Sequence, residues 1–260
     1  MTHANDREIV RVGAYLYPPY VEQDASGHLT GITPKVLNLL NQNQEQYQFV
    51  LVPISPKRRY QTFEQADYDM IFFENPAWGW DGIAFQQSRP RENDGEVFVA
   101  LAKAERDQSY FATLKGKRMI GILGFHYGFA GFNADEEYLR REFNMILSWT
   151  NENNLQLLKD RSGEIAIMSL SFLYRYFRDH PDERHFFLVS DTFDQLYRHS
   201  VLIRPGFTPD AAAMDALLDD LRAKQLLQPI FHDFGIYDCP VPPADGQLPR
   251  AAKNCDGKSQ

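Results

Sequence analysis

The chain has 260 residues, of which 43% are hydrophobic and 24% are charged, and its formal net charge is −8. These proportions are typical of a globular protein large enough for one big domain or two lobes. The negative charge argues against a nucleic-acid surface, and no apolar run is long enough to cross a membrane.

The first hundred residues alternate between strand and helix patterns. Apolar runs at 10–14, 49–52 and 70–73 predict three short strands. Between the first two, Thr33 followed by Pro34 predicts the start of a helix. A second, short helix is expected to begin at Pro56 and to lead into the third strand. Strands and helices in this order predict a parallel sheet.

The second part of the chain repeats this alternation after two polar spans, 88–96 and 103–109. Strands are predicted at 97–102, 119–123, 165–168, 186–189 and 199–203. Asn133 with Glu136 resembles a capping box, and Thr208 with Pro209 predicts the start of a last helix. We expect the chain to cross from one lobe to the other near Lys103 and to return near Val201.

The strand at 70–73 is followed by a group of acidic and aromatic side chains. Pro76 and Gly79 end the strand, and Glu74, Trp78, Trp80 and Asp81 lie around that break. Open α/β sheets bind ligands at the carboxyl ends of their parallel strands. These four residues are therefore candidates for a binding site, although solvated acids and packed tryptophans would explain them equally well.

Both cysteines, Cys239 and Cys255, lie in a tail rich in proline and glycine. Such a tail is not expected to form helix or sheet, and a disulfide that closes a short loop would order it in an oxidising compartment. Two unrelated free thiols are the alternative. The cysteines have no spacing to a histidine that would suggest a metal site.

The polar N-terminus shows no secretory leader, which fits a cytoplasmic protein or a secreted domain whose leader was removed.

Several short motifs occur in an order that resembles a known family. They are Val-Arg-Val-Gly followed by Pro-Pro-Tyr, Gly-His-Leu-Thr-Gly-Ile, Tyr-Asp-Met-Ile, Leu-Lys-Gly-Lys-Arg before Ile-Gly-Ile, Gly-Glu-Ile, and Leu-Leu-Gln-Pro-Ile-Phe. Over residues 10–236 the chain thus resembles the periplasmic solute-binding proteins of family 3, the amino-acid-type receptors of ABC importers.

The resemblance implies a two-lobed α/β fold of the type II periplasmic-binding-protein class. Each lobe would be a mostly parallel sheet flanked by helices, with a ligand cleft between the lobes that closes by a hinge motion. Residues 1–103 and 202–236 would form lobe 1, residues 104–201 lobe 2, and residues 237–260 a C-terminal tail.

The sequence departs from this family where the family grips an amino acid. The arginine that binds the ligand carboxylate falls at Asp81 here, and the aspartate that binds the ligand amine falls at Ser171. Small hydroxyl residues of the second lobe are replaced by Phe125 and His126. Both halves of the amino-acid clamp are thus changed, which puts an ordinary amino-acid ligand in doubt.

A ligand that carries a cationic amine-type group suits these residues better. Carboxylates attract such a group, and indole rings accept it by cation–π interaction. A carboxylate at the other end of the ligand could meet Arg59 or the backbone amides of the turn at 124–128. Tyr17 corresponds to the aromatic residue that packs on the ligand in the family. The candidate ligand-binding residues are Tyr15, Tyr17, Tyr20, Arg59, Glu74, Trp78, Trp80, Asp81, Phe125, His126, Tyr127 and Ser171.

The resemblance implies a non-catalytic, monomeric, periplasmic protein that needs no cofactor or metal. It would bind a small amine or amino-acid-like solute and deliver it to a membrane permease of the ABC type. Two alternatives remain open. The same fold serves as the sensor domain of signalling receptors, and some of its members are dehydratases, for which Glu74 or His126 could supply acid–base chemistry.

Overall fold

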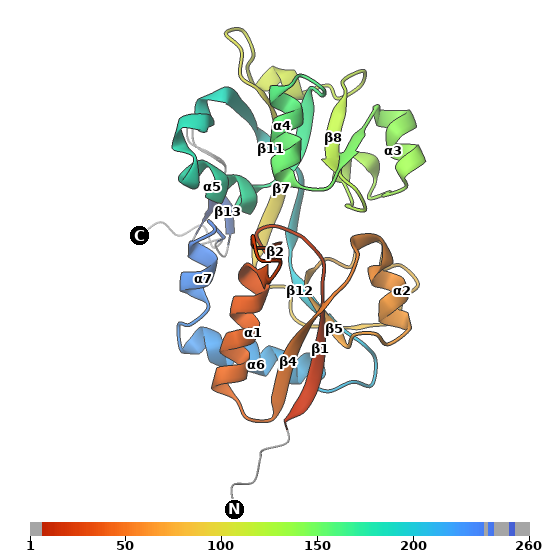
Figure 1. The fold of residues 1–260 in the computed structure, drawn as a ribbon, viewed down its shortest axis with the longest axis vertical. Helices are drawn as coiled ribbons and strands as arrows, with labels where there is room; N and C mark the ends of the chain where they lie inside the picture. Colours follow the sequence, from red (N-terminus) through yellow and green to blue (C-terminus); the bar gives the residue numbers. More distant parts are fainter. Residues whose placement is uncertain (1–6, 237–238, 242–249, 253–260) are drawn as a thin grey trace, which may run out of the picture. The chain divides into compact units, whose positions relative to one another are not determined.

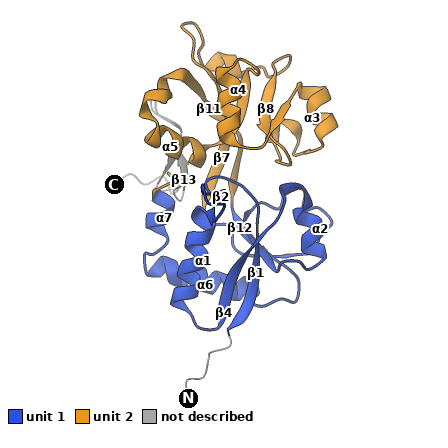
Figure 2. Cartoon of the chain, viewed as in Figure 1, with its two compact units in different colours: residues 1–76, 80–91, 199–232 blue, residues 77–79, 92–198, 233–260 orange. Residues whose placement is uncertain are grey.

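The computed structural model describes residues 7–236, 239–241 and 250–252, and the chain divides into two compact units (Figure 2). Unit 1 comprises residues 1–76, 80–91 and 199–232, and unit 2 comprises residues 77–79, 92–198 and 233–260. The lobe boundaries that we expect at residues 103 and 201 stay a prediction.

Unit 1 is built on a five-stranded sheet of order β4-β1-β5-β12-β6 (Figure 1). Three strands run parallel, and β12 and β6 are antiparallel to their neighbours. The elements are β1 (Glu8–Ala14), a small hairpin of β2 (Glu22–Gln23) and β3 (Leu29–Thr30), α1 (Ile32–Asn43), β4 (Tyr47–Pro53), η1 (Pro56–Arg58), α2 (Arg59–Glu64), β5 (Met70–Glu74), β6 (Gln86–Gln87), β12 (Ser200–Ile203), α6 (Ala211–Ala223) and α7 (Gln228–His232).

The helices of unit 1 cover the two faces of this sheet. α1 packs on β4 and against α6, and Figure 1 shows α2 on the other side of the sheet. All five residues of β5 are buried, from Met70 to Glu74, as expected for a central strand covered on both faces. The three parallel strands and the two early helices confirm the expected plan of this unit.

The helix starts of unit 1 differ from the expected ones because other groups satisfy the first amides. α1 begins at Ile32, and its first two amides donate to the carbonyls of Pro19 and Tyr20 at 3.0 and 2.8 Å. Gly31 precedes it with φ 105°, a conformation that favours glycine. Thr33 is therefore not the N-cap. Backbone carbonyls of a neighbouring loop accept the hydrogen bonds that a capping side chain would otherwise accept.

Two further expected caps are replaced by a nearby aspartate. α6 is capped by Asp210, whose side chain accepts from the Ala213 amide, and not by Thr208. α3 (Glu136–Phe143) is capped by Asp135, and not by Asn133. In both cases the aspartate stands directly before the helix, where its carboxylate also complements the helix dipole.

Unit 2 is built on a second five-stranded sheet, of order β11-β7-β10-β8-β9. β8, β9 and β10 are parallel, while β7 is antiparallel to both of its neighbours. The elements are β7 (Asn93–Leu101), η2 (Gln108–Phe111), β8 (Met119–Ile122), η3 (Gly128–Ala130), α3, β9 (Ile146–Ser148), α4 (Asn151–Lys159), β10 (Ile165–Ser169), α5 (Leu170–Asp179), η4 (Pro181–Phe186) and β11 (Phe187–Arg198).

Residues of the unit 2 strands alternate between two hydrophobic cores, one on each face of the sheet. Val97 and Val99 belong to the core that also holds Leu155 of α4 and Phe172 of α5. Phe98 and Ala100, on the other face, belong to the core that holds Leu139 of α3. The period of two along a strand explains why a continuous apolar run becomes a strand buried on both faces.

Two strands of unit 2 are longer than the sequence indicated. β7 begins at Asn93, inside the polar span at 88–96, and β11 continues to Arg198 instead of ending at Val189. β11 pairs with β7 through register shifts between Val189 and Gln195. These irregularities let polar residues continue along a paired strand, which a search for apolar runs does not detect.

The described part of the tail forms two short paired strands, β13 (Cys239–Val241) and β14 (Arg250–Ala252). The expectation of a tail without sheet is therefore wrong. Pro240 is tolerated because each strand of a two-stranded sheet is an edge. The expected disulfide involves Cys255, which lies outside the described residues.

None of the helices in the described part of the chain is both long and apolar enough to span a membrane.

A buried aspartate joins three strands of unit 1. Asp69, just before β5, accepts from the side chain of Arg11 at 2.6 and 3.0 Å and from that of Arg204 at 2.9 Å. Burial alone would raise the pKa of Asp69, but these hydrogen bonds outweigh it and hold the pKa below its usual range. Strands β1, β5 and the end of β12 are thus tied at one end of the sheet.

We expect Asp69→Asn to lower the free energy of unfolding by about 2–3 kcal/mol, because charge-assisted hydrogen bonds to two arginines are lost. Urea unfolding at pH 7 measures the change. Asp67→Asn is the matched control at an exposed position, where a change of no more than about 0.5 kcal/mol is expected. Equal effects of the two substitutions would contradict the structural role of Asp69.

Candidate functional site

In unit 1, three predicted site residues follow the carboxyl ends of the parallel strands. Tyr15 follows β1, Arg59 comes shortly after β4, and Glu74 ends β5. The carboxyl ends of parallel strands lie at one edge of a sheet, which is where α/β proteins bind ligands. The structure thus brings Tyr15, Arg59 and Glu74 together.

Arg59 and Glu74 form a buried ion pair. The Arg59 Nε lies 3.6 Å from Glu74 Oε1, and the two side chains are 2% and 0% exposed. The Trp80 indole donates to Glu74 Oε2 at 2.8 Å, and the Tyr15 hydroxyl also hydrogen-bonds to this carboxylate. Arg59 donates to the Pro56 carbonyl at 2.7 Å. The carboxylate and the guanidinium are therefore both engaged inside unit 1.

Aromatic rings surround this ion pair. The guanidinium of Arg59 lies 4.4 Å from the ring centre of Tyr60 and 5.1 Å from that of Tyr15. Burial raises the pKa of Glu74, while Arg59, Trp80 and Tyr15 oppose that rise. The pair is charge-compensated but isolated from water, so the loss of either partner would be costly.

A second aromatic group of unit 1 holds a histidine. His199 is 1% exposed, and its ring centre lies 4.6 Å from that of Tyr20, 5.7 Å from that of Phe73 and 6.1 Å from that of Tyr17. Burial lowers the pKa of His199 to about 3. The imidazole is therefore neutral at physiological pH. Tyr17 and Tyr20, both predicted as site residues, are buried in this group.

Trp78, Trp80 and Asp81 do not form one group. Trp80 belongs to unit 1 and contacts Glu74, whereas Trp78 belongs to unit 2. Asp81 is exposed. The sequence placed these residues together because they are neighbours in the chain, but the chain passes between the two units in this stretch.

In unit 2, the parallel strands β8, β9 and β10 also end at one edge. Phe125 and His126 follow β8, Trp149 follows β9, and Ser171 follows β10. His126 and Ser171 are buried, Phe125 is half-buried, and Trp149 is 72% exposed. Trp149 was not predicted as a site residue, although an exposed indole at such an edge is available for stacking on a ligand. Tyr127 instead packs in a core and donates from its hydroxyl to the Ile122 carbonyl.

Gln195 of β11 connects several predicted residues of unit 2. Its side-chain oxygen accepts from the Trp78 indole at 2.9 Å. Its amide donates to the His126 carbonyl at 2.7 Å and to Glu96 Oε2 at 3.0 Å. One buried amide thus orients Trp78, the turn after β8 and a carboxyl group of β7.

Two carboxylates of unit 2 accept hydrogen bonds from backbone amides, one at a turn and the other at a helix start. Asp194 accepts from the amides of Gly128 and Phe129, both at 2.7 Å. Asp94 accepts from Ser171 of α5, through the amide at 3.3 Å and the hydroxyl at 2.5 Å. A carboxylate therefore lies next to Ser171, where the family resemblance places an aspartate, but it comes from β7.

Glu96 is also buried, close enough to Asp94 and Asp194 for their charges to act on it. Burial raises its pKa well above the usual value, and the nearby charges of Asp194 and Asp94 raise it further. Asp94, Glu96 and Asp194 fall in segments whose residue pattern predicts no strand. Nothing in their local sequence distinguishes them from solvated acids, because their burial depends on β7 and β11 being paired.

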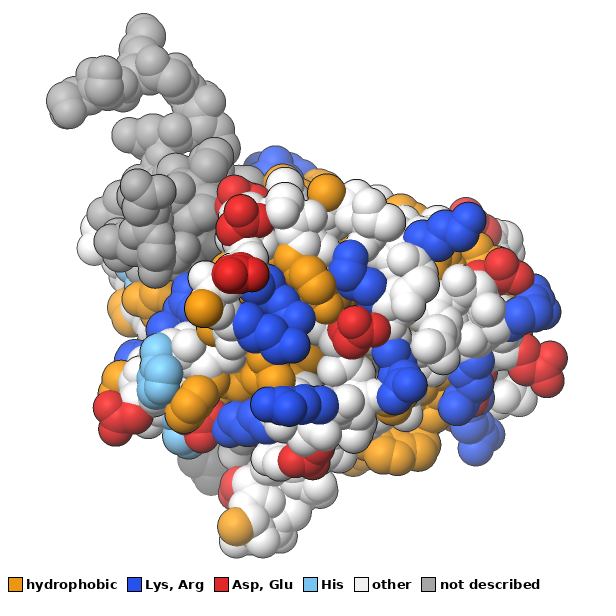
Figure 3. Space-filling view, turned by 90° about the horizontal axis from the view of Figure 1, so that it is seen from above, with side chains coloured by type: hydrophobic (Ala, Val, Ile, Leu, Met, Phe, Trp, Pro, Cys, Tyr) orange, Lys and Arg blue, Asp and Glu red, His pale blue; other side chains and the backbone are white. Residues whose placement is uncertain are grey.

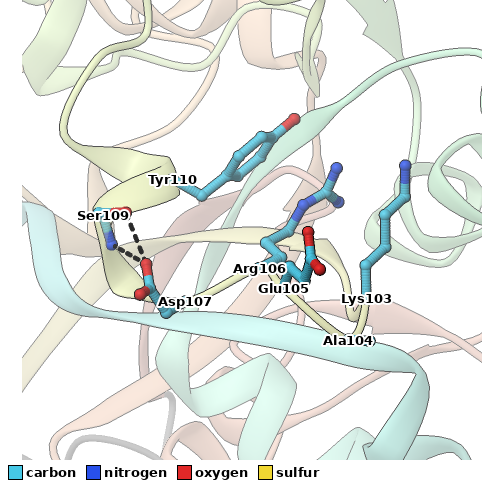
Figure 4. A pocket seen from close by; sticks show the side chains of 7 residues that line it. All are labelled: Lys103, Ala104, Glu105, Arg106, Asp107, Ser109 and Tyr110. Carbon is cyan, nitrogen blue, oxygen red and sulfur yellow. Dashed lines mark hydrogen bonds between the residues drawn. The ribbon is translucent and has the colours of Figure 1, made fainter.

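An open pocket in unit 2 lies apart from these edges, in the loop after β7 (Figure 4). Its polar groups are largely engaged with each other. Asp107 accepts from the amide and the hydroxyl of Ser109, and the Arg106 guanidinium lies 3.9 Å from the ring centre of Tyr110. Within the described residues, no group of three or more His, Cys, Asp and Glu side chains is arranged to hold a metal ion.

Comparisons with known proteins identify the fold. No model of a protein family matches the sequence, and a search of the curated proteins found no match. Solved structures do match, at 14–15% sequence identity. A substrate-binding protein of an ABC uptake transporter from Streptococcus pneumoniae, with bound histidine, aligns over 87% of this chain and 92% of its own, with a TM-score of 0.68.

Two further matches are similar in extent. The GluR0 ligand-binding core in complex with L-glutamate aligns over 86% of this chain and 97% of its own, with a TM-score of 0.68. An ancestral amino-acid-binding protein, a precursor of cyclohexadienyl dehydratase, aligns over 87% and 95%, with a TM-score of 0.66. The chain therefore has the α/β fold of the two-lobed periplasmic-binding-protein class, as the motifs indicated.

Proposed function

We propose that this protein binds a small polar solute without changing it chemically and delivers it to an ABC-type importer in the periplasm. The observation that supports this most is the fold, combined with the two sets of aromatic and polar residues at the carboxyl ends of parallel strands, one set in each unit. The solved structures of this fold include an ABC substrate-binding protein with bound histidine.

We further propose that the solute carries a cationic amine-type group. In the described part of unit 2, Asp94 and Glu96 are buried but no arginine or lysine is. In unit 1, the buried Arg59 is already matched by Glu74. A cationic group near these acids would offset the cost of their burial and their mutual repulsion, whereas an anion would add to both. Nearby aromatic rings would also attract a cation.

A thermal-shift screen over amines, guanidines, amino acids and neutral polyols tests the binding function. A solute that binds only the folded protein stabilises it by about 2.7 kcal/mol at one hundred times its dissociation constant. We expect cationic compounds to raise the melting temperature and anionic ones to leave it unchanged. Mass spectrometry of the recovered solute should show an unchanged compound, and a converted compound would contradict non-catalytic binding.

The ligand-sensing alternative is supported by the match to the GluR0 ligand-binding core. Both functions require the same binding step, so the screen supports either. Co-purification of the protein with a membrane permease would favour transport, and co-purification with a signalling receptor would favour sensing.

A further inference from the structure

Carboxylates of the protein itself contact the groups that could otherwise bind an anionic ligand. Carboxylates in proteins are held by arginine side chains and by backbone amides at turns and helix starts. Arg59 is the one arginine or lysine that is buried among the described residues, and it lies 3.6 Å from Glu74. In unit 1 the strongest buried anion-binding group is therefore already paired.

In unit 2, the backbone amides of the turn after β8 are likewise bound by a carboxylate of the protein. The carboxylate of Asp194 accepts from the Gly128 and Phe129 amides with one oxygen each, both at 2.7 Å. The backbone of Asp194 also approaches Gly128 so closely that a Cβ at position 128 would collide with the Asp194 carbonyl oxygen. Glycine at 128 therefore permits this close approach. The carboxylate of Asp194 thus binds backbone amides of the turn that the sequence suggested as a binding site for a ligand carboxylate.

The start of α5 is occupied by a third carboxylate. Asp94 accepts from the amide and the hydroxyl of Ser171, in the first turn of this ten-residue helix. The partial positive charge of the helix start is thus complemented from β7. Glu96 lies close enough to Asp94 and Asp194 for their charges to act on it. The described basic side chains of unit 2 are not buried, and Figure 3 shows lysine and arginine on the surface among acidic side chains.

We propose that the solute of this protein carries no free carboxylate, because Glu74, Asp94 and Asp194 occupy the buried and half-buried groups that would bind one. The solute class is that of organic amines and guanidines, such as the decarboxylated counterparts of basic amino acids. This inference rests on the proposed function and narrows it. A ligand carboxylate would find the donors taken and would meet like charges, so it would be desolvated without compensation.

Calorimetry on matched pairs tests this inference with the wild-type protein. Each pair differs only by the carboxylate: agmatine and arginine, putrescine and ornithine, cadaverine and lysine, histamine and histidine. L-Argininamide is included because it keeps the size of arginine but has no carboxylate charge. We expect the member without a carboxylate to bind at least about tenfold more tightly in the pair that binds best, and argininamide to bind like agmatine.

Asp194→Asn asks whether the internal carboxylate sets this preference. Removing its charge is expected to reduce the ratio of amine to amino-acid affinity, and Asp191→Asn is the matched control at an exposed position of the same strand. Equal or tighter binding of the amino acid in every pair would overturn the inference and leave the proposed function standing. If argininamide binds as weakly as arginine, the inference is also overturned, because the site would then reject both compounds for their size and not for a carboxylate charge. Absence of binding by every compound, here and in the broad screen, would overturn the proposed function as well.

Discussion

Replacing Arg59 with methionine is expected to lower the free energy of unfolding by about 3–5 kcal/mol. The substitution leaves the Glu74 carboxylate buried without its counter-charge, and an uncompensated buried charge is among the costliest defects in a folded protein. The Trp80 and Tyr15 hydrogen bonds remain, but they do not neutralise the charge. Urea unfolding at pH 7 gives the free-energy change from the midpoint and the slope.

The double variant Arg59→Met with Glu74→Gln distinguishes pairing from packing. If the charges compensate each other, the double variant loses less stability than the sum of the two single variants, with a coupling energy of about 1–3 kcal/mol. Arg58→Met is the matched control, because Arg58 is the adjacent residue and is exposed. An effect of Arg59→Met no larger than that of Arg58→Met would contradict a structural ion pair.

Acidification is expected to destabilise the protein through His199. Burial lowers the pKa of this histidine from its ordinary value of 6.5 to about 3. Between these values the unfolded chain binds a proton that the folded protein does not bind, so stability falls as the pH falls. The contribution is fully present above pH 6.5 and decreases by about 1.4 kcal/mol for each pH unit below it. Over the whole window the loss is about 5 kcal/mol.

Comparison with His199→Phe isolates this effect. Phenylalanine keeps an aromatic ring among Tyr17, Tyr20 and Phe73 but cannot be protonated. Glu74, Glu96 and Asp194 have raised pKa values and act in the opposite direction, but they are common to both proteins and cancel in the difference. We expect the stability difference between wild type and variant to change by about 3 kcal/mol between pH 6.5 and pH 4. An exposed histidine, His28, provides the control His28→Asn, and parallel profiles for wild type and His199→Phe would refute the assignment.

Part of the candidate site could be found from the sequence because it follows strand ends. Tyr15 and Glu74 lie where an apolar run stops, and Arg59 comes shortly after another. The carboxyl ends of parallel strands meet at one edge of a sheet whatever the details of packing. Phe125, His126 and Ser171 follow the strands of unit 2 in the same way. What these residues contact was not predictable, since Glu74 pairs with Arg59 and Ser171 with Asp94 through contacts distant in sequence.

The sequence by itself indicated the alternating strands and helices of an α/β protein, because runs of apolar residues with the period of a strand or a helix specify which faces are buried. The two-lobed plan followed from the resemblance of its motifs to the family 3 solute-binding proteins. The sequence also determined which loops follow the parallel strands. Only the tertiary structure decided which polar groups are buried and how they are paired. Asp94, Glu96 and Gln195 sit in polar segments that look solvated, and His199 begins a short predicted strand whose neighbours the sequence does not specify. They become buried because β7, β11 and β12 are paired by residues far apart in the chain, and no local pattern encodes that pairing.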